Sequence, residues 1–222
     1  RTLEMAIDNH QPSTLRDDFL TRNEAQLSGV RHVQVIACGT SYHAGMVAKY
    51  WFESITRLPC HVEVASEFRY RNPVVLDDSL VICISQSGET ADTLSALRDI
   101  KKQNPAGLVS LALCNVPTSS LVRETDVFLP TLAGPEIGVA STKAFTTQLV
   151  ALMLLMLKTG HVQGRIDDAA LANHIGELQK LPGQLYASLH LDAPIKAMAK
   201  AINRPVRPPD SSPSSASTCH VT

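Results

Sequence analysis

The sequence has almost no net charge and no apolar stretch long enough to cross a membrane. Its 20 Lys and Arg residues nearly balance 21 Asp and Glu residues, for a formal net charge of -1, so no strong positive field draws nucleic acid or an anionic membrane. The longest apolar run, Leu149 to Leu157, is far shorter than the ~20 residues of a spanning helix, and no charged-then-apolar signal segment opens the chain. These absences predict a soluble cytoplasmic protein that binds neither nucleic acid nor membranes.

Motifs for metals, cofactors and nucleotides are missing as well. The five cysteines form no CxxC pair, and no histidine lies at metal-ligand spacing from them, which predicts no metal site and no cofactor. Neither GxGxxG nor GxxxxGKS/T occurs, so a nucleotide-binding Rossmann-like domain is disfavoured. Because they lie in or beside apolar strand-like runs, four cysteines are predicted to be reduced, structural thiols: Cys38, Cys60, Cys83 and Cys114.

The chain does contain five strand-like runs separated by helical patterns or turns. With 222 residues and 44% apolar content, it can bury one substantial core. Strand runs that alternate with helices are typical of a parallel sheet with helices on both faces. We therefore predict an α/β fold with a five-stranded parallel sheet, a Rossmann-like three-layer sandwich. The runs lie near residues 33–37, 61–65, 80–84, 108–113 and 126–129.

The flanking segments set the predicted domain organisation. Residues 1–28 hold helix-friendly pieces broken at Pro12, and we expect an N-terminal helical linker or packing arm. The folded domain is predicted to span residues 29–202, with a deep apolar helix at 142–157 and amphipathic helices at 168–189 and 194–202. Residues 203–222 are rich in proline and serine. Since this composition buries too little surface to fold alone, we predict a disordered or non-native tail.

Hydroxyl side chains crowd one strand-to-helix turn. Ser85, Ser87 and Thr90 lie between the apolar run at 80–84 and the helical pattern that starts at Ala91. A helix N-terminus offers unpaired N–H groups and the positive end of the helix dipole, so these hydroxyls can complete a phosphate site without a cation. Alternatively, Ser87 or Thr90 only caps its own helix. This turn alone does not decide between the two interpretations.

A second turn has the same construction. The run at 33–37 is followed by Cys38, Gly39, Thr40 and Ser41, and then by apolar residues at helical spacing. Ligands of open parallel sheets bind outside the carboxyl ends of the strands. The two turns can therefore face one ligand if their strands are neighbours. A third candidate is the segment 134–143, which precedes the long apolar helix.

Three motifs together give the sequence a specific family resemblance. ACGTS at residues 37–41, SQSGETADT at 85–93 and EIGVASTKAFT at 136–146 resemble, in this order, the first sugar-isomerase (SIS) domain of the glutamine:fructose-6-phosphate amidotransferase family. The resemblance covers roughly residues 30–200. It implies the SIS fold and a place in the isomerase half of an isomerising transaminase, at the first step of hexosamine synthesis.

The resemblance also implies the residues of a sugar-phosphate site. Those that would hold the phosphate of fructose 6-phosphate or glucosamine 6-phosphate are Ser41, Ser85, Gln86, Ser87 and Thr90. Those that would contact the sugar are Cys38, Gly39, Thr40, Val139 and Ser141. In the family the catalytic base and the lysines of Schiff-base chemistry belong to a second SIS domain that no segment here matches. We therefore expect no catalytic residue in this chain and no activity from it alone. SIS domains usually pair, which implies a homodimer.

Other polar residues are first assigned to the surface. Without the resemblance, Glu136 is interpreted as an acid at a helix start and Lys143 as a solvated base. His43 is expected to be a surface or packing histidine, and Arg69 and Arg71 to be surface charges, although both arginines can approach an anion or a partner subunit. An alternative function is a stand-alone SIS phosphosugar-binding regulatory module. It would need a DNA-binding or partner segment, and the sequence shows none.

Overall fold

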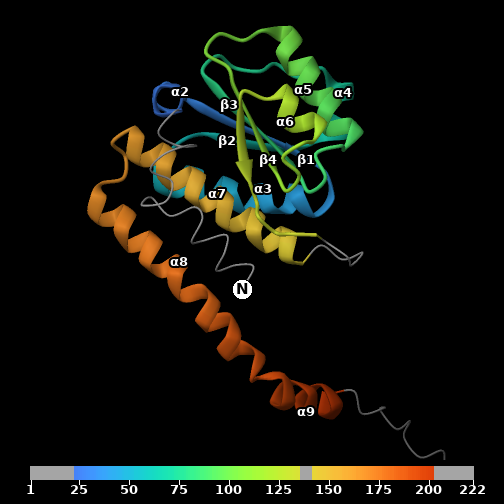
Figure 1. Ribbon diagram of the computed structural model, residues 1–222, viewed down its shortest axis with the longest axis vertical. Coiled ribbons are helices and arrows are strands. Elements are labelled where there is room, and N and C mark those ends of the chain that lie inside the picture. Colours follow the sequence, from blue (N-terminus) through green and yellow to red (C-terminus); the bar gives the residue numbers. More distant parts are fainter. Residues whose placement is uncertain (1–22, 136–141, 203–222) are drawn as a thin grey trace, which may run out of the picture. The chain divides into compact units, whose positions relative to one another are not determined.

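A five-stranded parallel sheet is the centre of the computed structural model, which describes residues 23–135 and 142–202 (Figure 1). Neighbouring strands run parallel in the order β2-β1-β3-β4-β5. The strands are β1 His32–Ala37, β2 Cys60–Val64, β3 Ser79–Ser85, β4 Val109–Cys114 and β5 Val127–Pro130. The predicted α/β fold is confirmed, and each strand lies within one residue of its predicted run at both ends.

Helices cover both faces of this sheet (Figure 1). On one face lie α3 Gly39–Trp51, the π-helical turn η1 Phe52–Thr56 and α7 Lys143–Val162. On the other face lie α4 Ala65–Arg71, α5 Ala91–Gln103 and α6 Ser120–Glu124. The short α2, Glu24–Ser28, packs against α7.

The central strand β3 shows why both faces need a cover. All its residues are buried, and successive side chains alternate between two apolar cores. Leu80, Ile82 and Ile84 pack with α3 and α7, whereas Val81 and Cys83 pack with α4 and α5. A strand buried on both faces has no polar side in its sequence, and its near-continuous apolar run reflects this position.

The helix α7 is apolar because it packs into the first of these cores. Its buried residues include Val150, Leu152 and Leu155, which confirms the predicted deep position against the sheet. Among residues 23–135 and 142–202 it is the one helix long and apolar enough to cross a membrane, and 61% of its most apolar window is buried inside the fold. That burial accounts for its composition. The helix ends at Val162, beyond the predicted end at Leu157.

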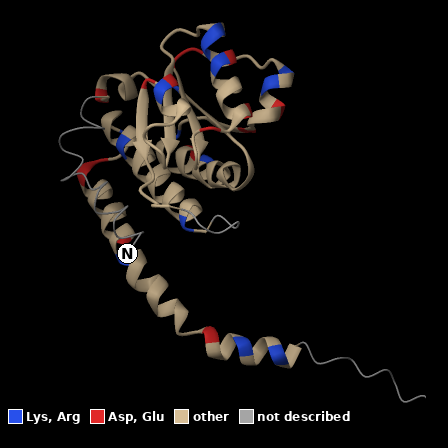
Figure 2. Cartoon of the chain, turned by 45° about the vertical axis from the view of Figure 1, so that its right-hand side comes forward, with Lys and Arg blue, Asp and Glu red and all other residues tan. Residues whose placement is uncertain are grey.

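Charged residues of both signs are interspersed over the described part of the chain (Figure 2). Arg69 pairs with Asp92 at 2.8 Å, and Arg71 pairs with Glu63. The side chains of both pairs remain partly exposed, so each pair contributes little to stability. Both arginines thus have carboxylate partners on the surface of their own chain.

The chain divides into two compact units, residues 1–182 and 183–222. The helix α8, Asp168–Leu189, begins in the first unit, where Leu171, Ile175 and Leu178 pack with the core around α7. The predicted arm up to residue 22 and the predicted tail from 203 lie outside the described residues. The predicted domain boundaries therefore stay predictions.

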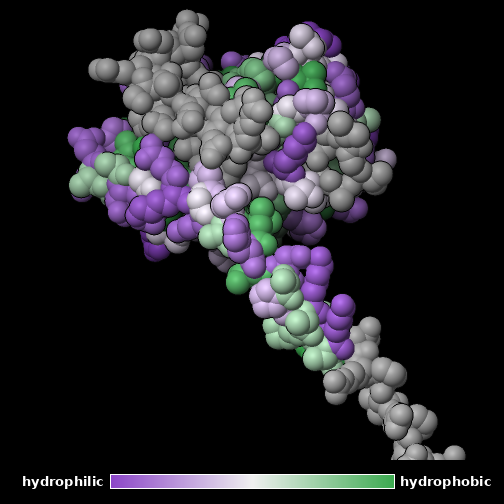
Figure 3. Space-filling model, turned by 60° about the horizontal axis from the view of Figure 1, so that its bottom comes forward, coloured by the Kyte–Doolittle hydropathy of each residue, from purple (hydrophilic) through white to green (hydrophobic). Residues whose placement is uncertain are grey.

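The second unit exposes a row of apolar side chains on α9, Asp192–Ile202. Ile195, Met198 and Ile202 recur at helical spacing and are 54%, 58% and 78% exposed. Figure 3 shows such apolar side chains in green next to hydrophilic ones in purple. The helix starts before the predicted residue 194 because Pro194 fits the first helical turn, where its missing N–H is not needed.

Candidate functional site

The two hydroxyl-bearing turns meet at one edge of the sheet. β1 and β3 are hydrogen-bonded neighbours, with Ala37 opposite Ile84 at their carboxyl ends. The two turns therefore follow neighbouring strands, which is what they need to face one ligand. From there the chain enters α3 on one face and α5 on the other (Figure 1). Such a point, where the strand order reverses direction, is where open α/β sheets bind ligands. We call residues 38–41 and 85–90, with the strand ends they follow, the β1/β3 edge.

The loop after β3 is folded around the hydroxyl of Ser85. This residue is 3% exposed. Its Oγ accepts a hydrogen bond from the Gly88 N–H at 3.0 Å and shares another with Thr90 Oγ1 at 2.9 Å. Ser87 Oγ accepts from the Glu89 N–H at 3.2 Å. These short-range bonds fix a tight turn directly before α5.

If Thr90 only capped α5, its hydroxyl would accept a hydrogen bond from a backbone N–H in the first turn of that helix, and this bond is not formed. Thr90 occupies the N-cap position of α5, but its side chain makes no cap hydrogen bond because it is turned to Ser85. Ser87 bonds within the turn, to Glu89. The first N–H groups of a helix have no partner inside the helix. The 13-residue α5 therefore directs its N-terminal donors and its positive dipole end toward the β1/β3 edge.

Glycine is required at position 88. Its φ is +69°, and a Cβ there would lie 2.1 Å from Ser119 Oγ and 2.8 Å from Cys114 Sγ. Only glycine allows this loop to lie against the segment after β4 without strain. Gly39 also has a positive φ, +57°, but a Cβ there would meet open space.

The loop after β1 leads at once into α3. Cys38 occupies the N-cap position and is half-buried, and Thr40 and Ser41 lie in the first helical turn. Ser41 Oγ accepts a hydrogen bond of 3.0 Å from Nε2 of Gln148 on α7. Gln148 was not predicted from the sequence. Its signal was a polar residue at a position whose neighbours one turn away, Ala144 and Leu152, are buried and apolar.

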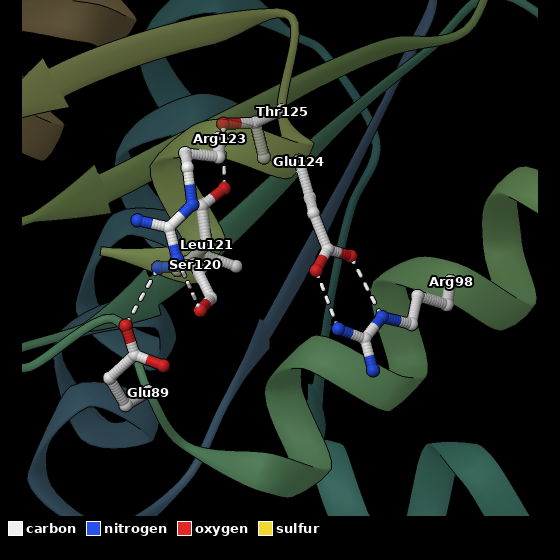
Figure 4. Close-up of polar contacts among 7 residues, drawn as sticks. All are labelled: Glu89, Arg98, Ser120, Leu121, Arg123, Glu124 and Thr125. Atoms are coloured by element: carbon white, nitrogen blue, oxygen red, sulfur yellow. Dashed lines mark hydrogen bonds and ion pairs between the residues drawn. The ribbon is translucent and has the colours of Figure 1, made fainter. Parts of the chain in front are cut away.

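A short helix braces the loop after β3 (Figure 4). Glu89 Oε1 accepts a 2.7 Å hydrogen bond from the Ser120 N–H at the start of α6, and the Leu121 N–H donates to the Gly88 carbonyl at 3.1 Å. Glu124 at the end of α6 accepts two hydrogen bonds from Arg98 of α5, at 2.8 and 2.5 Å. The loop and α5 are thereby joined through α6, a connection the sequence did not reveal.

The same contacts set the charge of the two carboxylates. The Ser120 N–H bond holds the pKa of Glu89 below its ordinary value, and the Arg98 bonds lower the pKa of Glu124. Glu89 is the one charged side chain in residues 38–41 and 85–90. Its negative charge is directed to the N–H of Ser120, so it is committed to a structural contact.

The third candidate loop is only partly described. Val139, Ser141 and Glu136 lie outside the described residues. The segment that leads there is held by Asn115, whose Nδ2 donates to the Gly134 carbonyl and whose Oδ1 accepts from the Ala133 N–H, each at 2.8 Å. Lys143 is the first residue of α7, and its Nζ donates to the Pro135 carbonyl. Lys143 thus has a partner on its own loop.

In the described part of the chain, no contact of His43 and no charge state of Cys60 or Cys83 would make these residues catalytic. His43 is exposed on α3 and contacts the ring of Tyr42 edge-on. Burial raises the pKa of Cys60 and of Cys83 to about 12, so neither supplies a thiolate near neutral pH. Within residues 23–135 and 142–202, no cluster of His, Cys, Asp and Glu is arranged to hold a metal ion.

Comparison with known proteins gives consistent matches. The SIS domain pattern matches residues 26–158. Glutamine-fructose-6-phosphate aminotransferase (isomerizing) of Acinetobacter baylyi is 54% identical over 203 residues, covering 90% of this chain and 33% of that enzyme. The Pseudomonas putida protein of the same name is 61% identical over 171 residues, covering 77% and 28%. The chain spans about a third of the length of these curated relatives.

A solved structure agrees with the sequence matches. The C-terminal domain of glucosamine-fructose-6-phosphate aminotransferase from Francisella tularensis has a TM-score of 0.82 and 45% identity, covering 90% of this chain and 55% of that one. The similarity therefore extends from the motifs to the whole arrangement of sheet and helices. Since the SIS pattern also spans more than half of the 222 residues, the chain belongs to the SIS domain family.

Proposed function

We propose that this chain binds the phosphate of fructose 6-phosphate or glucosamine 6-phosphate at the β1/β3 edge. The observation that carries the proposal is the meeting of two hydroxyl-bearing turns at the carboxyl ends of neighbouring strands. The residues proposed to hold the phosphate are Ser41, Ser85, Gln86, Ser87 and Thr90. Those proposed to contact the sugar are Cys38, Gly39, Thr40, Val139 and Ser141.

The chemistry of these groups suits a dianion. Hydroxyls, an amide and backbone N–H groups form charge-assisted hydrogen bonds to phosphate oxygens, and such bonds are stronger than neutral ones. The N-terminus of α5 adds its dipole. No cation comes from residues 38–41 or 85–90. The site we propose therefore recognises phosphate through directed donors rather than through an ion pair.

We further propose that the chain is the sugar-phosphate-binding part of the isomerase half of a glutamine-fructose-6-phosphate aminotransferase, an enzyme that supplies amino sugars. Support comes from relatives of that name at 54% and 61% identity. We propose that the protein is cytoplasmic and forms a homodimer through SIS domains. We also propose that its SIS domain spans residues 29–202 and is flanked by an arm at 1–28 and a non-native or disordered tail from 203. We assign no catalytic residue to the described part of the chain.

Calorimetry tests the binding proposal. The chain should bind fructose 6-phosphate and glucosamine 6-phosphate but not fructose or glucosamine. Ser87→Ala, which removes one charge-assisted bond of about 1.5–3 kcal/mol, should weaken binding roughly ten- to a hundredfold. Ser54→Ala is the matched control, because Ser54 is an exposed serine on η1 whose hydroxyl bonds the Tyr50 carbonyl. Equal binding of fructose and fructose 6-phosphate would rule the proposed site out.

A further inference from the structure

One buried polar side chain contacts the β1/β3 edge from another element. Gln148 on α7 is 2% exposed, and its Nε2 donates a 3.0 Å hydrogen bond to Ser41 Oγ. Its other polar atom, Oε1, is buried and has no hydrogen-bond partner in the described part of the chain. Ser41 and Gln148 lie 107 residues apart in the sequence, so this bond fixes the start of α3 against α7.

Packing alone does not explain a glutamine at this position. A buried amide with one unpaired atom costs folding free energy, whereas an apolar side chain of similar size does not. The neighbouring positions on this side of α7, Ala144, Ala151 and Leu152, are buried and apolar. A methionine or leucine at 148 would continue this surface. The one polar contact that glutamine provides is the bond to Ser41.

Gln163 provides an instructive comparison at the other end of α7. Its Oε1 is also buried without a partner in the described residues. Its Nε2, however, donates to the carbonyls of Leu27 and Val30, both at 2.9 Å. Those bonds attach α2 and the segment after it to the end of α7, so Gln163 has a structural role. Gln148 instead donates to a single side-chain hydroxyl of the proposed site.

That bond determines what the Ser41 hydroxyl can do. A hydroxyl has one proton to donate and two lone pairs to accept with. Because Ser41 Oγ accepts from the Gln148 amide, its own proton remains to be donated elsewhere, and no further partner of this hydroxyl lies in the described residues. A phosphate oxygen is an acceptor only. We propose that Gln148 is a positioning residue, which orients the Ser41 hydroxyl as a donor to a phosphate bound at the β1/β3 edge; this rests on the proposed function.

Isothermal titration with fructose 6-phosphate tests this role by a double-mutant cycle. Gln148→Met keeps the volume and removes the donor, so it should weaken binding about three- to tenfold. In the Ser41→Ala background the same change should have no effect, since there is no hydroxyl left to orient. Gln163→Met, the matched control, should lower thermal stability and leave affinity unchanged. An equal loss from Gln148→Met with and without Ser41 would overturn the proposal.

A second variant gives a pH readout that a packing role would not. In Gln148→Glu, a protonated carboxyl still donates to Ser41, whereas the ionised form only accepts and turns the Ser41 proton away from the phosphate. The ratio of variant to wild-type dissociation constants should therefore rise with pH. A ratio independent of pH would refute the orienting role. Binding of fructose 6-phosphate by wild type, and weaker but measurable binding by Ser41→Ala, tests the proposed function separately.

Discussion

At the scale of single residues, the β1/β3 edge depends on where hydroxyls and one glycine lie. Ser85 is buried and bonds both Gly88 and Thr90, so one side chain sets the shape of its loop. Gly88 then allows that loop to approach Ser119 more closely than any side chain would permit. The hydrogen bonds of Ser85 therefore hold the loop together, and the close contact of Gly88 with Ser119 holds it against the segment after β4.

Gly88→Ala should therefore damage both stability and binding. A positive φ costs a non-glycine residue about 1–2 kcal/mol, and the overlap with Ser119 should add about 1–3 kcal/mol of overpacking. Gly164→Ala is the matched control, because Gly164 has a φ of +66° with open space at its Cβ position. Urea unfolding should show a larger loss for Gly88→Ala than for Gly164→Ala, and Ser119→Gly should partly restore the difference. Equal losses would mean that the backbone strain alone matters.

At the scale of elements, α6 stands out because it is too short to be stable by itself. Five residues form little more than one helical turn, and isolated helices of this length do not persist in water. Glu89 bonds the first residue of α6, the buried Leu121 anchors it in the core, and Arg98 bonds its last residue. The element exists because its neighbours hold it, and it in turn fixes the loop after β3.

The charge of Glu89 should give this brace a pH dependence. A lowered pKa means that the ionised form is the one stabilised by the Ser120 N–H. The contribution is complete above the ordinary carboxyl value of 4.5 and is lost as the pH falls through the lower folded-state pKa. Thermal melts should show Glu89→Gln less stable than wild type near about pH 7, with the difference shrinking as the pH falls below 4.5 and through the lowered pKa of Glu89.

The control for this prediction is Glu177→Gln, since Glu177 forms an exposed ion pair with Lys180. Such a pair is worth little, so its removal should change the melting temperature much less at any pH. A Glu89→Gln difference that stays constant from neutral to acidic pH would show that the carboxylate charge does not support α6.

How far the sequence predicts each element follows from how local its causes are. The strands β3 and β4 were predicted within one residue because they are buried on both faces and leave continuous apolar runs in the sequence. The end of α7 was not, since residues distant in the sequence hold this part of the helix: Lys158 pairs with Glu24, and Gly160 packs against Thr56.

The same reasoning applies to the candidate site. Hydroxyls after two strands were visible in the sequence because each turn is continuous along the chain. Gln148 and Asn115 were not, because each acts on a segment that only folding brings near: Ser41 for Gln148, and Ala133 with Gly134 for Asn115. The brace through α6 depends in the same way on a contact between Glu89 and Ser120, 31 residues apart.

At the scale of the whole molecule, the apolar side of α9 should favour association. Ile195, Met198 and Ile202 are more than half exposed, and contiguous apolar surface of this kind tends to be covered. Sedimentation velocity should show self-association that the combined change Ile195→Ser and Met198→Ser reduces. Lys200→Ser, on the same helix, should leave it unchanged. Association that persists in the double variant would have to use another surface, such as the proposed pairing of SIS domains.

The last prediction is that this chain alone does not convert fructose 6-phosphate to glucose 6-phosphate. Phosphate binding holds the ground state and the transition state alike, so it lowers the dissociation constant without moving a proton between C1 and C2. A positioned base contributes about 10²- to 10⁴-fold to such a step and needs a pKa near the working pH. Glu89 has a lowered pKa and a structural partner, Lys143 is bonded to the Pro135 carbonyl, and His43 is exposed on α3.

A coupled assay of glucose 6-phosphate formation checks this directly, because isomerisation consumes neither glutamine nor ammonia. The wild-type chain, shown by calorimetry to bind fructose 6-phosphate, should give no turnover above a Ser87→Ala preparation purified in the same way. Turnover that disappears in His43→Ala or Glu136→Gln would instead place the catalytic base in this chain. The phosphate site would then be only one part of its active site, and the proposed division between binding and proton transfer would be wrong.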